Sequence, residues 1–145
     1  MSTTTYSFTD INATISHPSY GSYSIQGEGI GDLTITKTTD RSAHDVAADG
    51  SIMVSKIAGN NGQAVVNAQQ TSSLHKFLQG LFNYLWSADT SEWAKISMTV
   101  VAPKMGKTYY CNGGSFVKEA DEPFQSQGQR IAWTLLFADV QRVQL

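Results

Sequence analysis

Two glycine-containing segments carry residue types that bind phosphate groups in other proteins. Gly27–Gly31 reads Gly-Glu-Gly-Ile-Gly, but a dinucleotide-binding motif must follow a strand and open a helix, whose N-terminus holds the pyrophosphate. Here the segment precedes the expected strand Leu33–Thr39, which is the wrong geometry. Gly106-Lys107-Thr108 matches only the end of a phosphate-binding loop, because the earlier glycine is replaced by Val101. We therefore expect Gly27–Gly31 to form a bulged or flexible loop and Gly106-Lys107-Thr108 to form an ordinary turn. We expect no cofactor.

Candidate catalytic and metal-binding residues are few and isolated. Ser42, His44 and Asp45 are the residue types of a hydrolytic triad, but triads are assembled from distant segments. Three residues within four positions cannot easily form the required relay. His17, His44 and His75 lack C-x-x-C or H-x-x-x-H spacing, so no metal site is indicated. We expect the protein not to be an enzyme.

The composition predicts one folded domain, spanning residues 1–145, with a weakly charged surface. Hydrophobic residues make up 41% of the 145 residues and charged residues only 15%, against about 25% in ordinary soluble domains. Such a surface is poorly protected against self-association. The net charge of −2 disfavours tight binding to nucleic acid. With Cys111 alone, no secretory signal and no apolar stretch of about 20 residues, we expect folding in a cytoplasm and no membrane contact.

One amphipathic helix is expected over residues 73–86. Gly80 lies within it, which predicts the close approach of another backbone. A lone helix with so apolar a face must pack on a sheet, so the fold class is β-rich (α+β) with one flanking helix. Six residues at helical spacing form the expected core face: Leu74, Phe77, Leu78, Leu81, Phe82 and Leu85.

Most of the remaining chain reads as strands and turns. Segment 17–31 has a loop-like composition. Asn112-Gly113-Gly114 is a hairpin turn or a bulge, and Asp49-Gly50 and Asn61-Gly62 are turns. The last of these is expected to join Ser51–Ile57 and Gln63–Gln69 as a two-stranded unit. Other strands are predicted from alternating apolar residues at Tyr6–Ile15, Leu33–Thr39, Lys95–Val101 and Arg130–Phe137.

Residues 38–50 contain almost no bulky apolar side chains, so this segment is expected to be a mobile loop or an arm ordered by a partner. Arg41 and Asp45 could pair with each other or with charges across an interface. The interface residues that we expect here are Asp40, Arg41, His44, Asp45, Val46, Asp49 and Gly50.

Three short motifs follow one another between Asp40 and Leu85. They are Ala48-Asp49-Gly50, Asn60-Asn61-Gly62 and Gln70-Thr71-Ser72. Their order, with strands between them and a helix after them, resembles a family of bacteriophage tail-tube proteins, here of a contractile-tailed phage. The resemblance is loose outside this region.

This resemblance implies a β-sandwich or small barrel with one flanking helix and an extended loop or hairpin arm that reaches an adjacent subunit or ring. It implies hexameric rings that stack into a tube for DNA ejection, with tape-measure protein and transiting DNA in the lumen. If the tail is contractile, which the sequence leaves open, a tail sheath would lie outside the tube, with baseplate and tail-terminator proteins at the ends. The protein would be part of the virion tail, assembled in the host cytoplasm.

Two alternatives remain open at this point. The same tube could serve a phage-related contractile injector or secretion system. A small ligand-binding β-domain would instead show a concave pocket built from exposed aromatic residues, for which the candidates are Tyr20, Tyr23, Trp93, Tyr109 and Tyr110.

Overall fold

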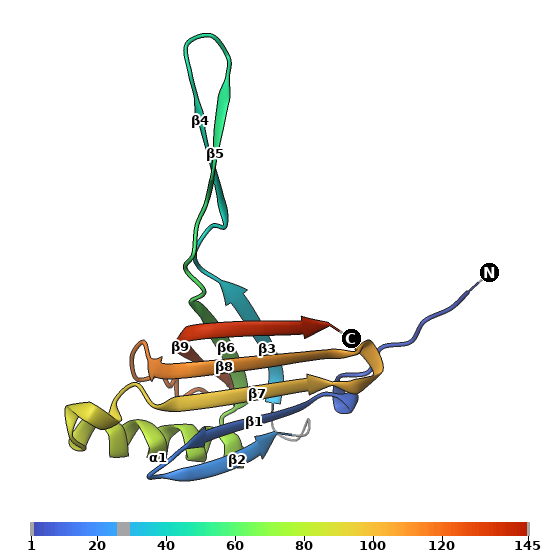
Figure 1. The fold of residues 1–145 in the computed structure, drawn as a ribbon. Coiled ribbons are helices and arrows are strands. Elements are labelled where there is room, and N and C mark those ends of the chain that lie inside the picture. The colour runs from blue at the N-terminus through green and yellow to red at the C-terminus, as the bar shows by residue number, and fades with distance from the viewer. Residues whose placement is uncertain (1, 26–29, 145) are drawn as a thin grey trace.

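The fold is a curled antiparallel sheet with one helix and a projecting hairpin, shown in a computed structural model that describes residues 2–25 and 30–144 (Figure 1). The seven-stranded sheet has the order β2-β1-β7-β8-β9-β6-β3, and β4 and β5 pair only with each other. This confirms the predicted β-rich fold. The strands are β1 (Asn12–His17), β2 (Gly21–Ile25), β3 (Ile30–Lys37), β4 (Ser42–Val46), β5 (Ile52–Lys56), β6 (Gly62–Gln69), β7 (Ile96–Ala102), β8 (Lys107–Phe116) and β9 (Arg130–Gln144).

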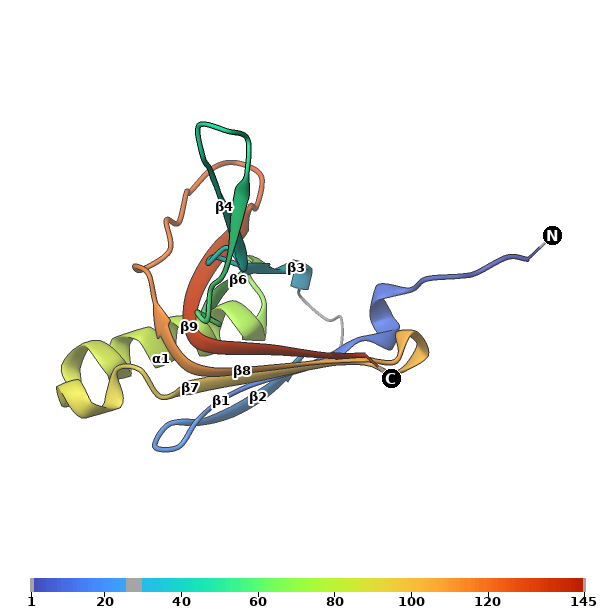
Figure 2. The same ribbon diagram turned by 45° about the horizontal axis from the view of Figure 1, so that its top comes forward.

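The sheet bends sharply across β8 and β9 (Figure 2). Ile96 lies opposite Gly114 and Met98 opposite Cys111, so β8 carries one residue more than β7 between these pairs. Gly113 has a φ of 66° at this point, a conformation that favours glycine. Asn112-Gly113-Gly114 therefore forms a bulge within one strand and not a hairpin turn, which decides between the two possibilities left open by the sequence.

The helix α1 (Ser73–Ser87) packs against the inward face of the curled sheet. Its N-cap is Ser72, whose hydroxyl accepts a hydrogen bond from the His75 backbone N–H at 3.2 Å. Phe77 and Phe82 are half-buried at the edges of the contact. Four leucines on the apolar face are buried in the same core as the strands: Leu74, Leu78, Leu81 and Leu85.

The expected close approach at Gly80 is made by a side chain and not by a backbone. A Cβ at this position would lie 2.3 Å from the hydroxyl oxygen of Tyr20. Tyr20 also packs edge-on against Phe77, with ring centroids 5.6 Å apart. Gly80 therefore makes room for an aromatic residue of the β1–β2 connection.

Three strand predictions were wrong in extent or pairing. The first strand begins only at Asn12, because Phe8–Asp10 forms a 3₁₀ turn. Segment 17–31, read as a loop, contains β2, whose glycine and serine residues hid its alternation. The expected unit of Ser51–Ile57 with Gln63–Gln69 does not exist, because β5 pairs with β4, whereas β6 lies between β3 and β9.

Candidate assembly surfaces

The hairpin arm, residues 42–56, projects from the body of the molecule (Figure 1). Every residue of β4 and β5 is exposed. At its tip Gly50 has a φ of 88°, and Asp49 Oδ1 accepts hydrogen bonds from the Ser51 N–H at 3.0 Å and the Ser51 hydroxyl at 2.7 Å. These bonds hold the pKa of Asp49 below its ordinary value of 3.8. Of the two possibilities expected for residues 38–50, a mobile loop or an arm, the structure has the arm, and this arm extends beyond residue 50 to Lys56.

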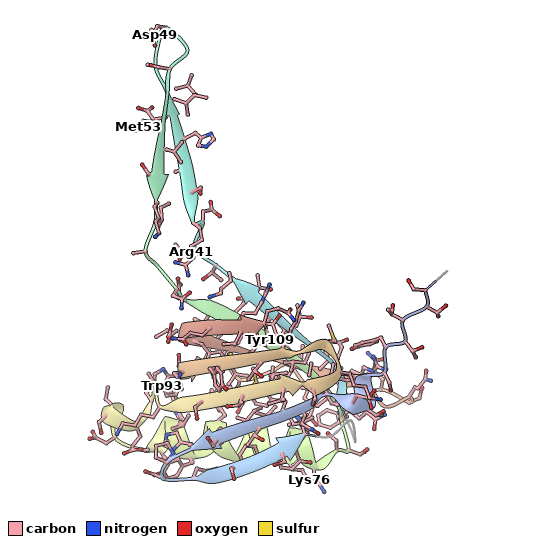
Figure 3. All side chains as sticks on the ribbon, turned by 45° about the vertical axis from the view of Figure 1, so that its right-hand side comes forward. Arg41, Asp49, Met53, Lys76, Trp93 and Tyr109 are labelled. Atoms are coloured by element: carbon pink, nitrogen blue, oxygen red, sulfur yellow. The ribbon has the colours of Figure 1, made fainter. Side chains whose placement is uncertain are left out.

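One face of the arm carries an apolar stripe, which we define as Val46, Ile52 and Val54. Val46 lies opposite Ile52, and Val54 lies opposite His44, so these side chains share a face. The stripe residues are 65%, 56% and 63% exposed, respectively. Met53 points to the other face (Figure 3). Because an isolated two-stranded hairpin is only marginally stable in water, this stripe suits contact with a further chain.

The base of the arm is joined to the body through Asn60. Its side-chain oxygen accepts hydrogen bonds from Lys37 at 2.6 Å and from Arg41. Its amide nitrogen donates to Asp139 Oδ1 of β9 at 2.5 Å. Arg41 also donates to the Ile57 carbonyl at 3.3 Å. Arg41 is therefore used within the subunit at the arm's base, and within the described residues it forms no ion pair with Asp45.

A second surface lies on the side of the sheet away from α1, where neutral polar residues alternate with the buried ones. Thr14 of β1 is opposite Ser24 on one side and Thr99 on the other. Tyr110 and Gln141 continue the same row across β8 and β9. We call this surface the hydroxyl face. It comprises Asn12, Thr14, Ser16, Ser22, Ser24, Ser97, Thr99, Val101, Thr108, Tyr110, Asn112, Asp139, Gln141 and Val143.

A third surface lies at the C-terminal end of α1. Trp86 is 75% exposed and stacks on Phe82, with ring centroids 6.3 Å apart. Trp93 meets Trp86 edge-on, and a cavity of about 220 Å³ lies beside them. Trp86 is exposed whereas Phe82 and Trp93 are half-buried, so this cluster is a candidate for a third contact site.

The residues that could have formed a hydrolytic triad lie on the arm without the geometry for it. Ser42 and His44 share one face of β4 and Asp45 lies on the other. Burial raises the pKa of the Cys111 thiol to about 11, so this thiol is not poised as a nucleophile. The structure therefore gives these residues no chemistry to perform.

The two buried histidines have structural partners. His75 Nδ1 accepts a hydrogen bond from the Trp133 indole N–H at 3.1 Å, which leaves Nε2–H to donate to Glu122 at 3.1 Å. His17 Nε2 donates to the Glu92 carbonyl at 2.9 Å. In the part of the chain that the structure describes, no three His, Cys, Asp or Glu side chains gather as they would around a metal ion. No described helix has the length and apolarity needed to span a bilayer.

The glycine motifs are accounted for only in part. Most of Gly27–Gly31 lies outside the described residues, whereas Ile30 and Gly31 begin β3. Gly106, with a φ of 67°, ends the 3₁₀ turn Pro103–Met105 just before β8. An ordinary turn is therefore found at the second motif.

The aromatic residues considered for ligand binding do not converge. Tyr20 and Tyr23 both pack against Phe77 of α1. Tyr109 lies beneath the Arg142 guanidinium, 5.0 Å from the ring centroid, while its neighbour Tyr110 points to the hydroxyl face. The arrangement does not favour a single aromatic pocket.

Sequence reasoning missed parts of both main surfaces. Ile52 and Val54 belong to the stripe but lie beyond residues 38–50, because the pairing of β5 with β4 was not foreseen. The hydroxyl face had a readable signal in the alternation at Ala13-Thr14-Ile15-Ser16 and at Ser97-Met98-Thr99, where only the apolar positions were used. Hydroxyl side chains on alternate positions of neighbouring strands could have indicated it.

Comparisons with known proteins agree on one architecture. In the anti-feeding prophage baseplate, one chain superposes with a TM-score of 0.63 at 14% identity, covering 99% of this chain and 98% of that one. A chain of the anti-feeding prophage tube-terminating cap superposes with a TM-score of 0.62 at 3% identity, covering 100% of this chain and 94% of that one. The third structure is the sheath–tube complex of an extracellular contractile injection system, PVC, in the extended state. One of its chains superposes with a TM-score of 0.57 at 9% identity, covering 92% of this chain and 88% of that one.

These likenesses show a shared fold, and no curated protein matches the chain in sequence. The family description "Bacteriophage PhiTE tail tube protein" matches residues 1–144. This confirms the resemblance found in the sequence, and it places the chain among structural tube proteins and not among enzymes. The protein belongs to the bacteriophage PhiTE tail tube family.

Proposed function

We propose that this tail tube protein stacks as hexameric rings into the channel through which DNA leaves the particle, with the whole chain acting as one tube domain. The observation that carries the proposal is the hairpin arm. Its apolar stripe is exposed in the single subunit, and the arm residues make no packing contact with the buried core. Ordering such a segment requires a partner, and copies of the same chain supply one.

The arm engages an adjacent subunit or the next ring. In this proposal Val46 and Asp49-Gly50 lie in the contact, together with Ile52 and Val54, whereas Arg41 fixes the arm's base. The ring is completed along sheet edges. β2 is an edge strand that carries no charge, no proline and no bulge, so it has none of the features that keep edges from pairing.

In this proposal the remaining partners are assigned by their place inside, around or at the ends of the tube. Tape-measure protein and then DNA occupy the lumen, a sheath surrounds the tube, and baseplate and terminator proteins close its ends. In this proposal the Trp86 and Trp93 surface at the end of α1 contacts the sheath, because Trp86 is exposed there. Assembly takes place in the host cytoplasm, and the finished tube is part of the virion tail.

A second candidate is the tube of a phage-related contractile injector. It is favoured by the structural neighbours, which come from an anti-feeding prophage and an extracellular contractile injection system. The two functions share one tube and differ in cargo, so the presence of a DNA-filled capsid on purified particles distinguishes them.

Self-assembly is tested on the purified chain by sedimentation and electron microscopy at increasing protein concentration. We expect large species whose end views have six-fold symmetry. The measurement is repeated in a strongly hydrated salt such as ammonium sulfate, which favours burial of apolar surface. A stable monomer under all these conditions, and also after addition of sonicated tail fragments as seeds, would count against a tube subunit.

A further inference from the structure

The acidic strap, which we define as residues 117–129, joins β8 to β9 and presents one aromatic side chain beside negative charge. Lys118 is its single cation and pairs with Asp121 at 3.8 Å. Phe124 is 87% exposed, more than any other large apolar side chain in the described part of the chain. The strap has a net negative charge, because it contains the carboxylates of Glu119, Asp121 and Glu122.

Hydrogen bonds hold the strap on its own subunit. The Gln79 amide of α1 donates to Glu119 Oε2 at 2.8 Å, and the Gln70 amide donates to the Pro123 carbonyl at 3.0 Å. Phe124 therefore follows directly on an anchored residue. An ordered backbone of this kind loses less entropy on binding than a free loop does, so the strap suits docking into a second surface.

An apolar groove lies on the concave face of the sheet, at the end away from the strap. In Figure 2 the strap rises at the left, whereas the turn between β7 and β8, which borders the groove at Met105, lies at the right. An apolar cavity of about 150 Å³ accommodates benzene. The groove contains a cavity of about 200 Å³, which has room for a phenylalanine ring and whose lining includes Leu33, Ile35, Val100 and Tyr109.

Two cations lie beside the groove. Lys107 lines the cavity, and the Arg142 guanidinium lies 5.0 Å from the centre of the Tyr109 ring. Among the described residues neither cation forms an ion pair, and none of those that line the cavity is acidic. Asp10 borders the adjoining cavity, where Lys104 pairs with it at 3.2 Å. The groove therefore combines an apolar floor with positive charge.

We infer that the acidic strap of one subunit docks in the apolar groove of a second copy, with Phe124 in the cavity and Asp121 beside Lys107 and Arg142. The inference rests on the proposed tube function and deepens it, because it names two surfaces that meet between subunits. The surfaces are complementary, since a ring meets a cavity and negative charge meets positive charge. Contact between two different surfaces is heterologous, so it can repeat from copy to copy and build a ring or a stack.

The strap does not reach the groove of its own subunit. Gln70, which holds Pro123, follows the last residue of β6. Ile35 of the groove pairs with Ala64, near the opposite end of that strand. The six residues of extended chain between Ala64 and Gln70 span about 20 Å. A second copy is therefore the occupant of the groove that this chain itself supplies.

Cross-linking in assembled tubes tests the contact directly. Asp121→Cys subunits are mixed with Lys107→Cys subunits, and the tubes are treated with a short bis-maleimide. Cys111 is buried and does not compete for the reagent. We expect covalent dimers on a denaturing gel. Lys95→Cys replaces Lys107→Cys as the matched control, because Lys95 precedes the far end of β7 and should give no dimers with Asp121→Cys.

Charge reversal tests the pairing. Asp121→Lys and Lys107→Asp, each alone, should raise the critical concentration for tube growth about tenfold, because like charges then face each other across the contact. The two changes together should restore growth, whereas Asp121→Lys with Lys95→Asp should not. Because the Asp121 side chain is 91% exposed, the melting temperature of the single Asp121→Lys subunit should stay unchanged. Phe124→Ala, which leaves the cavity empty, should raise the critical concentration as well.

The results separate this contact from the tube function itself. If wild-type tubes form while Asp121→Cys and Lys107→Cys give no more dimers than the Lys95→Cys control, the inference is overturned and the proposed function stands. Growth that the combined charge reversal fails to restore, in subunits that circular dichroism shows to be folded, overturns the inference too. A wild-type chain that forms no tubes, even with seeds, refutes the proposed function and this contact with it.

Discussion

The hairpin arm offers the sharpest test of assembly. We would change its apolar stripe to threonine in one variant, Val46→Thr, Ile52→Thr and Val54→Thr. Threonine is also β-branched and keeps the strand propensity of the arm. Because the stripe residues lie outside the buried core, the melting temperature of the single subunit should stay unchanged. Only contacts made by the arm in an assembly should weaken.

The magnitude follows from how much of each side chain an assembly can still bury. Each Val→Thr change removes about 0.8 kcal/mol of methyl burial and Ile52→Thr, which loses two carbons, removes about 1.6 kcal/mol. Each change also desolvates a hydroxyl at a cost of about 0.5–2 kcal/mol. The three side chains are 65%, 56% and 63% exposed, so only this part can be newly buried. The sum is about 3–6 kcal/mol per arm, which raises the critical concentration for tube growth about 100- to 20,000-fold.

The assay is sedimentation of tubes over a concentration series, with electron microscopy of the pellet and circular dichroism of the supernatant. Met53→Thr is the matched control, since it removes apolar surface from the opposite face of the same hairpin and should have a smaller effect. If the triple variant grows tubes at the wild-type critical concentration, the stripe is not an assembly contact and the reasoning is refuted.

Three further predictions concern the body of the subunit. Leu78→Ala or Leu81→Ala should each lower the free energy of unfolding by about 2–5 kcal/mol, and unchanged melting temperatures would mean that the helix does not support the core. Asn60→Ala should leave Lys37 and Asp139 without their common partner at the arm's base and reduce tube yield more than subunit stability; a normal yield would contradict this role. Hydrogen bonds from Gln70 and His75 hold the pKa of Glu122 below its ordinary 4.5. The stability that these bonds provide is therefore present above pH 4.5 and is lost as the pH falls through the lower folded-state pKa, so the melting temperature should fall over this range. Glu122→Gln should reduce this fall in melting temperature, and an unchanged fall would exclude Glu122 as its source.

The sequence by itself determined those features that depend on residues within one short segment. The helix follows from leucines and phenylalanines at a spacing of 3.6 residues and from the capping serine before it, all within one short segment. The strand at Arg130–Phe137 follows in the same way from strict alternation. The first part of the arm, up to Gly50, was marked by its lack of core-forming residues. The order of three short motifs, with strands between them and a helix after them, carried the resemblance to the family.

What only the tertiary structure decided was which strands lie together. Alternation of apolar and polar residues indicates that a segment is an extended strand, but it does not identify the neighbouring strand that completes its hydrogen bonds. The turn signal at Asn61-Gly62 therefore suggested a partner for Ser51–Ile57 that the fold does not use, since the chain there returns from the arm into the sheet. The hydroxyl face has the same origin. Its residues come from strands distant in sequence, and their mostly neutral side chains form one surface only when β1, β2, β7, β8 and β9 lie side by side.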